Sequence, residues 1–319
     1  MTAPDWLTDI SLITFDCFGT LLDWRRGLER VDITSRADFE AFEAECLVLQ
    51  KADIWTSYAQ ILKRAIAKTK PELRPAVVGL FADDFGRMTA FPDSSRALAT
   101  LRDMVQVGVL SNCDANHQLD AIAGLHVAWD VCITSQELRA YKPTDRAWDA
   151  ILRMGVARTA VPRDAWLHVS AFQSYDISPA RARGLRTCLV QRLGGDEKAA
   201  CDLTVTGLDE LVELVREAKH GPVVVEIENV CTDAAVRERL GAWLVSDHLA
   251  AMRDIAGVRD ARLVERDDGA LVEFYNFGGT KELENYDAHF AAEHRSAMRD
   301  LFGATVNRTT RQHRLRAKA

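Results

Sequence analysis

Short apolar runs that alternate with helical stretches constrain the fold of this 319-residue chain more than any other feature of its sequence. Each run is long enough for one buried strand, and the residues between the runs carry apolar side chains at helical spacing. The runs lie at residues 11–15, 105–110, 131–134, 166–169 and 187–190. Strands that alternate with helices form β-α-β units, so we expect an α/β fold with a parallel, Rossmann-like sheet and helices on both faces.

A long stretch without any strand pattern follows the first of these runs. Proline is sparse in residues 22–90, and apolar residues recur there at helical spacing. The expected helices cover residues 37–51, 55–68 and 75–88. The sequence therefore predicts a first domain over residues 1–219, made of a core (1–21 and 91–219) with an inserted helical cap (22–90).

A second pattern begins after Lys219-His220-Gly221-Pro222, which we interpret as a linker. Expected strands and helices then follow in the order β-α-β-β-α-β, with a hairpin turn at Asp267-Asp268-Gly269. The strands are expected at 223–230, 258–266, 270–277 and 304–314, and the helices at 233–255 and 282–301. This order is that of a smaller ferredoxin-like α+β domain, which we place at residues 222–316.

The composition limits the classes of partner. The chain is 48% hydrophobic and 27% charged, and its net charge of −7 offers no basic surface for nucleic acid. No apolar run approaches the roughly 20 residues needed to cross a bilayer, and Asp5 and Asp9 lie where a signal peptide would be basic. The seven cysteines are scattered and form no C-x-x-C pair. We therefore expect a soluble cytoplasmic protein with reduced thiols, no zinc site, and no nucleic-acid or membrane partner.

Polar side chains cluster directly after three of the expected strands. Asp16, Ser111 and the segment 170–176 each follow a strand, and ligands bind at the edge where parallel strands end. A carboxylate at a strand end, beside the backbone N–H groups of a glycine-containing turn, can attack an electrophile and form an ester. Asp16 is therefore the candidate nucleophile. Its alternative role is that of a turn-forming aspartate that binds its own backbone.

Five segments, taken together in this order, carry a resemblance to a known family. They are FDCFGTLLDW at 15–24, FPDSSRAL at 91–98, VGVLSNCD at 107–114, AYKPTDRAW at 140–148 and WLHVSAFQSYDISPARARGL at 166–185. The set resembles the haloacid dehalogenase superfamily, and more closely its 2-haloacid dehalogenase-like branch. Residues 222–316 resemble small dimeric α/β-barrel domains, which implies a homodimer. In that second domain Trp243, His248, Tyr286 and His294 are candidates to line a pocket between sheet and helices.

The resemblance and the chemistry of the side chains together suggest five catalytic residues. Thr20 and Ser111 would donate hydrogen bonds to the substrate or to Asp16, and Lys142 would keep Asp16 ionised, because an adjacent cation lowers a carboxyl pKa. Asp176 would orient Lys142, help to activate the hydrolytic water, or bind a cation. The alternatives are helix caps for Thr20, Ser111 and Asp176, and a solvated surface position for Lys142.

Residues near these five are candidates for substrate contacts, and Phe172 and Trp148 would supply apolar wall unless they are core aromatics. The full set is Cys17, Phe18, Lys51, Asn112, Trp148, Ser170 and Phe172. Three departures from the family's pattern fall on such contacts. The cap stretch 41–51 has no arginine to contact a leaving halide, so Lys51 is the nearest cation. Trp148 replaces a tyrosine, and Ser170-Ala171-Phe172-Gln173 replaces a serine-rich stretch.

The position two residues after the nucleophile separates two chemistries. Phosphatases of the superfamily carry the pattern D-x-D at this position, and their second aspartate protonates the leaving alkoxide. This chain has Phe18, which transfers no proton. A halide leaves without a proton, and an aromatic residue is common here in the dehalogenases. The resemblance therefore implies catalysis without a metal or other cofactor, with Mg²⁺ expected only for phosphatase-like chemistry.

We expect a hydrolase that displaces a leaving group from carbon through an ester on Asp16, with a small 2-haloacid, a carboxylate, as substrate. Three alternatives stay open. The same nucleophile would also suit a non-halide C–X bond or a strained ring. A Mg²⁺-dependent phosphatase is the second alternative. The third is a ligand-binding protein that uses its C-terminal domain.

Overall fold

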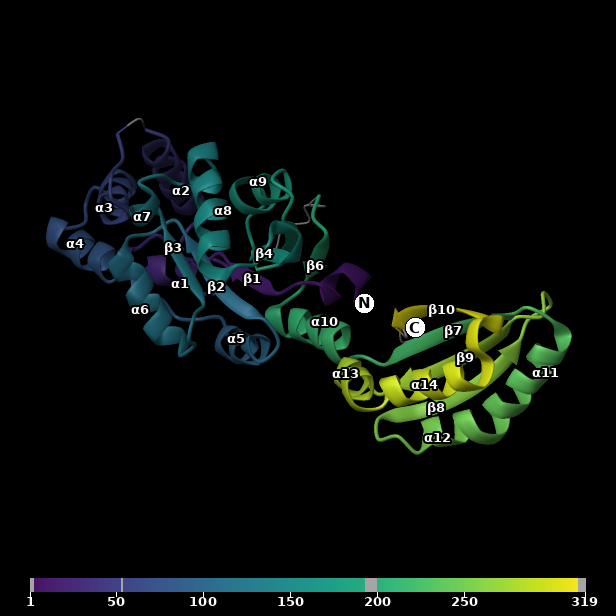
Figure 1. Cartoon of the computed structure of the whole chain (residues 1–319). Coiled ribbons are helices and arrows are strands. Elements are labelled where there is room, and N and C mark those ends of the chain that lie inside the picture. Colours follow the sequence, from purple (N-terminus) through teal and green to yellow (C-terminus); the bar gives the residue numbers. More distant parts are fainter. Residues whose placement is uncertain (1–2, 53, 193–199, 315–319) are drawn as a thin grey trace. The chain divides into compact units, whose positions relative to one another are not determined.

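The computed structural model describes residues 3–52, 54–192 and 200–314, which form two compact units (Figure 1). The larger unit spans Asp9–Glu213, and the smaller combines Met1–Thr8 with Leu214–Ala319. None of the described helices is both long enough and apolar enough to cross a bilayer. The division of the chain into a hydrolase domain at residues 1–219 and a ferredoxin-like domain at residues 222–316 stays a prediction.

A six-stranded parallel sheet forms the centre of the larger unit, in the order β3-β2-β1-β4-β5-β6. Its strands are β1 (Leu12–Phe15), β2 (Gln106–Ser111), β3 (Val131–Thr134), β4 (Trp166–Ser170), β5 (Arg186–Val190) and β6 (Leu203–Val205). Every pairing is parallel. The predicted Rossmann-like sheet is thus confirmed, with β6 as an additional edge strand. Because β1 lies between β2 and β4, the residue after β1 is placed at the middle of the carboxyl edge.

Helices connect these strands and cover the sheet, as Figure 1 shows. They are α5 (Ser94–Arg102), α6 (Ala115–Leu125), α7 (Ser135–Leu138), α8 (Asp145–Thr159), α9 (Ser178–Arg181) and α10 (Leu208–His220). The predicted linker is wrong in part, because α10 includes Lys219 and His220. Basic side chains in the last turn of a helix interact favourably with its free carbonyl groups, which explains why the helix continues to this point.

The stretch between β1 and α5 contains helices and no strand within its described residues, as predicted. Its α-helices are α1 (Trp24–Leu28), α2 (Arg36–Gln50), α3 (Tyr58–Thr69) and α4 (Pro75–Asp83). Local sequence fixes their beginnings: the Ser35 hydroxyl accepts a hydrogen bond from the Asp38 N–H at 3.1 Å, and Pro75 begins α4. Phe42 and Cys46 of α2 are buried on its inner face.

A four-stranded antiparallel sheet forms the smaller unit, in the order β10-β7-β9-β8. Its strands are β7 (Val223–Cys231), β8 (Val258–Glu265), β9 (Leu271–Phe277) and β10 (Val306–Arg314). Its α-helices are α11 (Ala234–Trp243), α12 (Leu249–Arg253), α13 (Thr280–His289) and α14 (Ala291–Phe302). The predicted order β-α-β-β-α-β is confirmed, and Gly269 adopts φ +80° in the predicted hairpin turn.

Both helical segments of this unit are interrupted where the sequence predicts continuous helices. A π-helical turn, Leu244–His248, separates α11 from α12. Phe290 leaves the helical conformation (φ −123°, ψ −33°) between α13 and α14, and it packs against the core of the unit. The helical periodicity of the sequence continues through both interruptions, so it does not reveal them.

Candidate active site

Asp16 directly follows β1, the strand at the middle of the parallel sheet. Its backbone N–H donates to the Val169 carbonyl at 3.0 Å, which extends the pairing with β4 by one residue. The chain then turns through Gly19 at φ +96°, a conformation that glycine adopts readily. The Thr20 hydroxyl donates to Asp16 Oδ2 at 3.0 Å and accepts from the Ala171 N–H at 3.0 Å. Thr20 thus holds the carboxylate and does not cap a helix.

Lys142 is buried and contacts the other oxygen of Asp16. Its Nζ atom donates to Asp16 Oδ1 at 3.1 Å, to Asp176 Oδ1 at 2.6 Å and to the Leu110 carbonyl at 2.8 Å. The Asn112 amide binds both the N–H and the carbonyl of Lys142, each at 2.9 Å. Lys142 is therefore positioned through its backbone as well as its side chain, and it is not a surface lysine.

Asp176 is fully buried and lies inside a π-helical turn, Gln173–Ile177, so it is not a helix cap. Its Oδ2 atom accepts from the Ser170 hydroxyl at 2.8 Å, and its Oδ1 atom lies 3.2 Å from Nε2 of His168. Burial lowers the pKa of His168, so the neutral imidazole donates one N–H to Asp176 and accepts at Nδ1 from the Thr14 hydroxyl at 3.0 Å. The sequence interpretation did not include His168.

Burial and neighbouring charges shift the pKa values of these groups in opposite directions. Burial raises the pKa of Asp16 to about 6, against the lowering effect of Lys142. Burial also favours a neutral Asp176, but Lys142 and His168 outweigh it and hold that pKa below its usual value. The two carboxylates in turn raise the pKa of Lys142 despite its burial. Asp176 and Lys142 are thus a stable ion pair, and Asp16 is the carboxyl group that titrates nearest neutrality.

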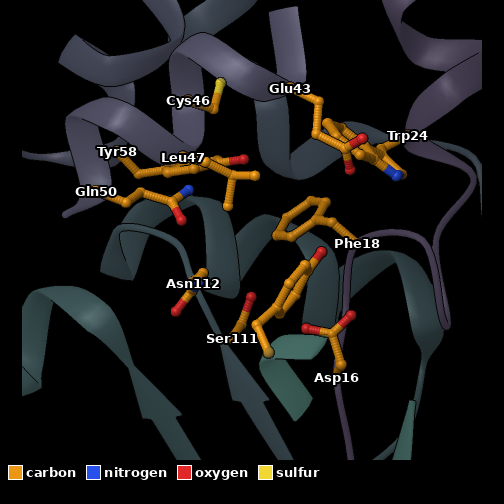
Figure 2. Close-up of a pocket in the computed structure, with 11 residues that line it drawn as sticks. Asp16, Phe18, Trp24, Glu43, Cys46, Leu47, Gln50, Tyr58, Ser111 and Asn112 are labelled. Atoms are coloured by element: carbon orange, nitrogen blue, oxygen red, sulfur yellow. The ribbon is translucent and has the colours of Figure 1, made fainter. Parts of the chain in front are cut away.

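A cavity of about 40 Å³ opens over Asp16, which suits a small ligand. Figure 2 shows Asp16 and Ser111 on the sheet side and Glu43, Cys46 and Leu47 on the side of α2. The lining residues are Asp16, Phe18, Trp24, Glu43, Cys46, Leu47, Gln50, Tyr58, Ser111, Asn112 and Tyr175. The Ser111 hydroxyl is buried and has no hydrogen-bond partner of ordinary geometry among the described residues, so it is available to a ligand.

Several predicted substrate contacts do not line this cavity. Trp148 is fully buried in the hydrophobic core, where its indole N–H donates to the Tyr175 carbonyl at 3.2 Å, so its predicted role as apolar wall is wrong. Lys51 is exposed just after α2 and is not a lining residue, because the helix turns its neighbour Gln50 inward instead. The Cys17 side chain is buried away from the cavity.

Two further predicted substrate contacts, Ser170 and Phe172, do not line the cavity but contact residues of the site. The Ser170 hydroxyl is used by Asp176 and by the Phe172 N–H at 3.0 Å. The Phe172 ring stacks on Tyr175, with the ring centroids 4.6 Å apart, so Tyr175 and not Phe172 faces the cavity. Phe18 and Asn112, two other predicted substrate contacts, line the cavity, and Phe18 packs against Phe85 at a centroid distance of 4.6 Å.

The cap contributes residues that sequence reasoning missed. Glu43, Leu47 and Gln50 recur at helical spacing on one face of α2. This spacing is the feature of the sequence that could have identified them as cavity residues. Burial raises the pKa of Glu43, and Arg25 opposes this shift. Burial also raises the pKa of the Cys46 thiol, with Glu43 adding to the effect. The cap wall therefore carries one carboxyl group and one protonated thiol, and no lysine or arginine lines the cavity in the described part of the chain.

The donor set at Asp16 is poor in side-chain ligands for a divalent cation. Nζ of Lys142 lies 3.1 Å from Asp16 and 2.6 Å from Asp176, so a positive charge already stands between the two carboxylates. The Phe18 side chain supplies no oxygen ligand, and Mg²⁺ requires nearly octahedral oxygen coordination. Within residues 3–52, 54–192 and 200–314, no group of three or more His, Cys, Asp or Glu side chains is arranged to hold a metal ion.

The comparisons with known proteins agree with this geometry. No family model matches the chain. The chain is 25% identical over 205 residues to an (S)-2-haloacid dehalogenase of Xanthobacter autotrophicus, covering 60% of this chain and 78% of that protein. The structure of an L-2-haloacid dehalogenase from Xanthobacter autotrophicus matches with a TM-score of 0.56 and 19% identity, covering 65% of this chain and 98% of that one. A defluorinating L-2-haloacid dehalogenase matches with a TM-score of 0.56 and 21% identity, covering 68% and 99%.

These matches cover nearly all of the two solved chains but only about two thirds of this one. They confirm the predicted fold, a Rossmann-like sheet of the haloacid dehalogenase kind. The relatives are 2-haloacid dehalogenases, which are hydrolytic enzymes.

Proposed function

We propose that this protein is a hydrolase that displaces a leaving group from carbon through an ester on Asp16, and that it dehalogenates a small 2-haloacid. The observation that carries the proposal is the position of Asp16 beneath the cavity, with Thr20 bound to one of its oxygens and Lys142 to the other. A carboxylate held in this way has a fixed direction of attack and keeps its negative charge.

In the first step an oxygen of ionised Asp16 attacks the carbon that bears the leaving group. A C–O bond forms, the carbon–halogen bond breaks, and the halide departs with the bonding electrons and without a proton. Attack from the side opposite the halide inverts the configuration at that carbon. The free Ser111 hydroxyl is positioned to donate to a substrate oxygen, including that of a carboxylate.

In the second step water attacks the carboxyl carbon of the Asp16 ester. The acyl C–O bond breaks, the product leaves as an alcohol, and one water oxygen stays on Asp16. A carbon–halogen bond and one water are thus converted into an alcohol, a halide and a proton. Asp176 holds Lys142 in place during both steps, and Ser170 and His168 hold Asp176.

Glu43 supports a second candidate reaction within the same mechanism. It faces the cavity from α2, and no cation lines the cavity in the described part of the chain. A carboxylate there repels a departing halide, whereas a protonated carboxyl with a raised pKa can donate to a leaving oxygen. Glu43 would then supply the proton that Phe18 cannot, and the substrate would be a strained ring or another C–O bond.

Single turnover in ¹⁸O-water, with excess enzyme over substrate, tests the proposed ester. We expect one ¹⁸O atom in the Asp16 carboxylate by mass analysis of the peptide that contains it. The Asp16→Asn variant is the control and should give neither label nor product. Product formation without label in Asp16 would contradict covalent catalysis.

The leaving group is identified by a separate assay. Chloride, fluoride and phosphate release are measured across a small panel of haloacids, epoxides and p-nitrophenyl phosphate, with and without Mg²⁺. We expect halide release that is independent of Mg²⁺. Phosphate release that requires Mg²⁺ would instead favour the phosphatase alternative.

A further inference from the structure

The smaller unit contains a buried group of charged and polar side chains, centred on Glu273 of β9. Glu273 is fully buried and accepts hydrogen bonds from the Tyr275 hydroxyl and from Asn229 Nδ2, the latter at 2.7 Å. The Arg308 guanidinium lies 3.5 Å from its Oε1 atom. Burial alone would raise the pKa of Glu273, but its partners outweigh burial and hold the pKa below its usual value. Glu273 is therefore an ionised carboxylate in the interior.

Two histidines connect this carboxylate to the surface. Nε2 of His248 lies 3.4 Å from Glu273 Oε2, and Nδ1 of His248 lies 3.3 Å from Nδ1 of His294. His248 ends the π-helical turn and stacks on Trp243, with the ring centroids 4.9 Å apart. Such turns are frequent at functional sites. His294 on α14 is partly exposed, so the chain Glu273–His248–His294 runs from the interior to the solvent side.

The surroundings of His294 determine its charge. The groups that act on His294 are Glu293, which favours its protonation, and His248 and Arg308, which oppose it; Tyr286 lies with its ring centroid 6.0 Å away. Burial and the two opposing groups together lower its pKa, so His294 is a neutral base at pH 7.

A cavity of about 220 Å³ lies beside α14; its lining begins at Arg295, the residue after His294, and does not include His294. Its lining residues are Arg295, Met298, Arg299, Gly303, Val306 and Arg308. None of these lining residues is acidic. Arg308 belongs to both features, because it lines the cavity and pairs with Glu273, and its Nε atom is buried without a partner among the described residues. Guanidinium groups bind carboxylate and phosphate oxygens in a bidentate manner.

A purely structural role explains this arrangement poorly. A buried ion pair usually stabilises a fold no better than well-packed apolar residues of the same size. The charged group around Glu273 instead shares Arg308 with a cavity that three arginines line, and its partly exposed end, His294, directly precedes Arg295 of that cavity. Shifted titratable groups beside a cavity are typical of functional sites.

We propose that the smaller unit is a second ligand site, in which Arg295, Arg299 and Arg308 bind the oxyanion of a small organic acid, and that His294, the residue before Arg295 on α14, takes up a proton as the anion binds. The proton taken up by His294 creates an imidazolium, whose charge is balanced by the bound anion and, through His248, by Glu273. Carboxylates and phosphate monoesters both present suitable oxygens. This site involves none of the residues around Asp16, so it does not depend on the proposed hydrolase activity.

Calorimetric titration of the full chain with malonate and with inorganic phosphate tests the binding and separates the two oxyanions. We expect saturable binding of at least one probe at pH 7, weakened about tenfold or more in Arg295→Ala and Arg299→Ala. Arg262→Ala is the matched control, since Arg262 is an exposed arginine of the same unit that does not line the cavity. Absence of saturable binding by either probe, or equal weakening in Arg262→Ala, overturns the proposal.

Histidine NMR of the full chain tests the proton exchange. We expect the titration midpoint of His294 to rise in the presence of the bound probe, because the anion stabilises the imidazolium. Glu273→Gln should lower that midpoint in the free protein. If this variant does not fold, His294→Gln replaces it and should remove the pH dependence of probe binding between pH 5 and 8. A His294 midpoint that the saturating probe leaves unchanged overturns the acid–base role.

Discussion

In the proposed mechanism Asp16 must lose its proton before it can attack, and its burial raises the pH at which this happens. Its pKa is raised to about 6, so the group is protonated and inactive below that pH and ionised above it. We expect kcat/KM to rise with pH through a midpoint near 6 and to level off above it. The measurement is a pH profile between 4.5 and 8, with a substrate that does not itself titrate in that range. A profile that is flat through pH 6 would contradict the raised pKa.

From its position in the cavity lining, we expect Glu43 to determine which leaving groups react. Glu43→Gln removes its charge and its acidic proton at almost constant volume. We expect kcat/KM to increase several-fold for a halide leaving group, because repulsion is lost. For an oxygen leaving group we expect it to fall by about 10²–10⁴, the usual contribution of a general acid. The control is Glu29→Gln, an exposed glutamate of the cap that does not line the cavity, which should change neither rate. If both rates are unchanged in Glu43→Gln, Glu43 does not face the leaving group.

The sequence was sufficient for the residues that follow strands and insufficient for those that face the cap. Asp16, Ser111 and Asp176 come together because parallel strands end at one edge, which the strand order along the chain already implies. Tyr175 and Glu43 line the cavity because of how the cap helices and the turn after β4 pack, and this depends on contacts distant in the sequence. Single aromatic positions such as Trp148 fit a core and a cavity wall equally well.

At the scale of elements, Gly155 allows helix α8 to pack closely on β4. A Cβ atom at this position would lie 2.2 Å from the Trp166 ring, so Gly155→Ala should destabilise the protein by about 1–3 kcal/mol through overpacking. The matched control is Gly79→Ala in helix α4, where a Cβ atom would meet nothing within 4 Å. Alanine should stabilise that helix by about 0.5–1 kcal/mol. Urea unfolding measures both, and equal effects of the two substitutions would refute this account.

Periodicity predicted which elements exist better than it predicted their ends and interruptions. Strand β6 has three residues, Leu203–Val205, too few for an alternating pattern to appear in the sequence. The π-helical turn before Leu249 contains no glycine or proline that would reveal it in the sequence. The helix α10 continues through Lys219 and His220 because a Gly-Pro pair ends a helix only at the residue before it. Such features depend on packing and hydrogen bonding that a local pattern does not contain.

At the scale of the whole molecule, the two units have separate hydrophobic clusters. One cluster surrounds Trp148 and Trp166, and another surrounds Met252 and Tyr275. Met252→Ala should remove about 2–5 kcal/mol from the stability of the smaller unit, since it leaves a cavity in that core. Hydrogen exchange of the full chain, followed by mass spectrometry, should show faster exchange in β7 and β9 and unchanged exchange in β1 and β4. Faster exchange in both sheets would show that the units unfold together.

The substrates proposed for this protein are alkylating agents, and this gives the buried thiol of Cys46 a chemical consequence. A thiolate in the cavity would compete with Asp16 for the substrate and would form a thioether, which water does not cleave. Burial and the neighbouring Glu43 keep the Cys46 pKa high and therefore keep the thiol protonated. In the proposed mechanism, burial and the neighbouring Glu43 thus protect the protein from irreversible self-inactivation and leave the hydrolysable ester on Asp16 as the productive outcome.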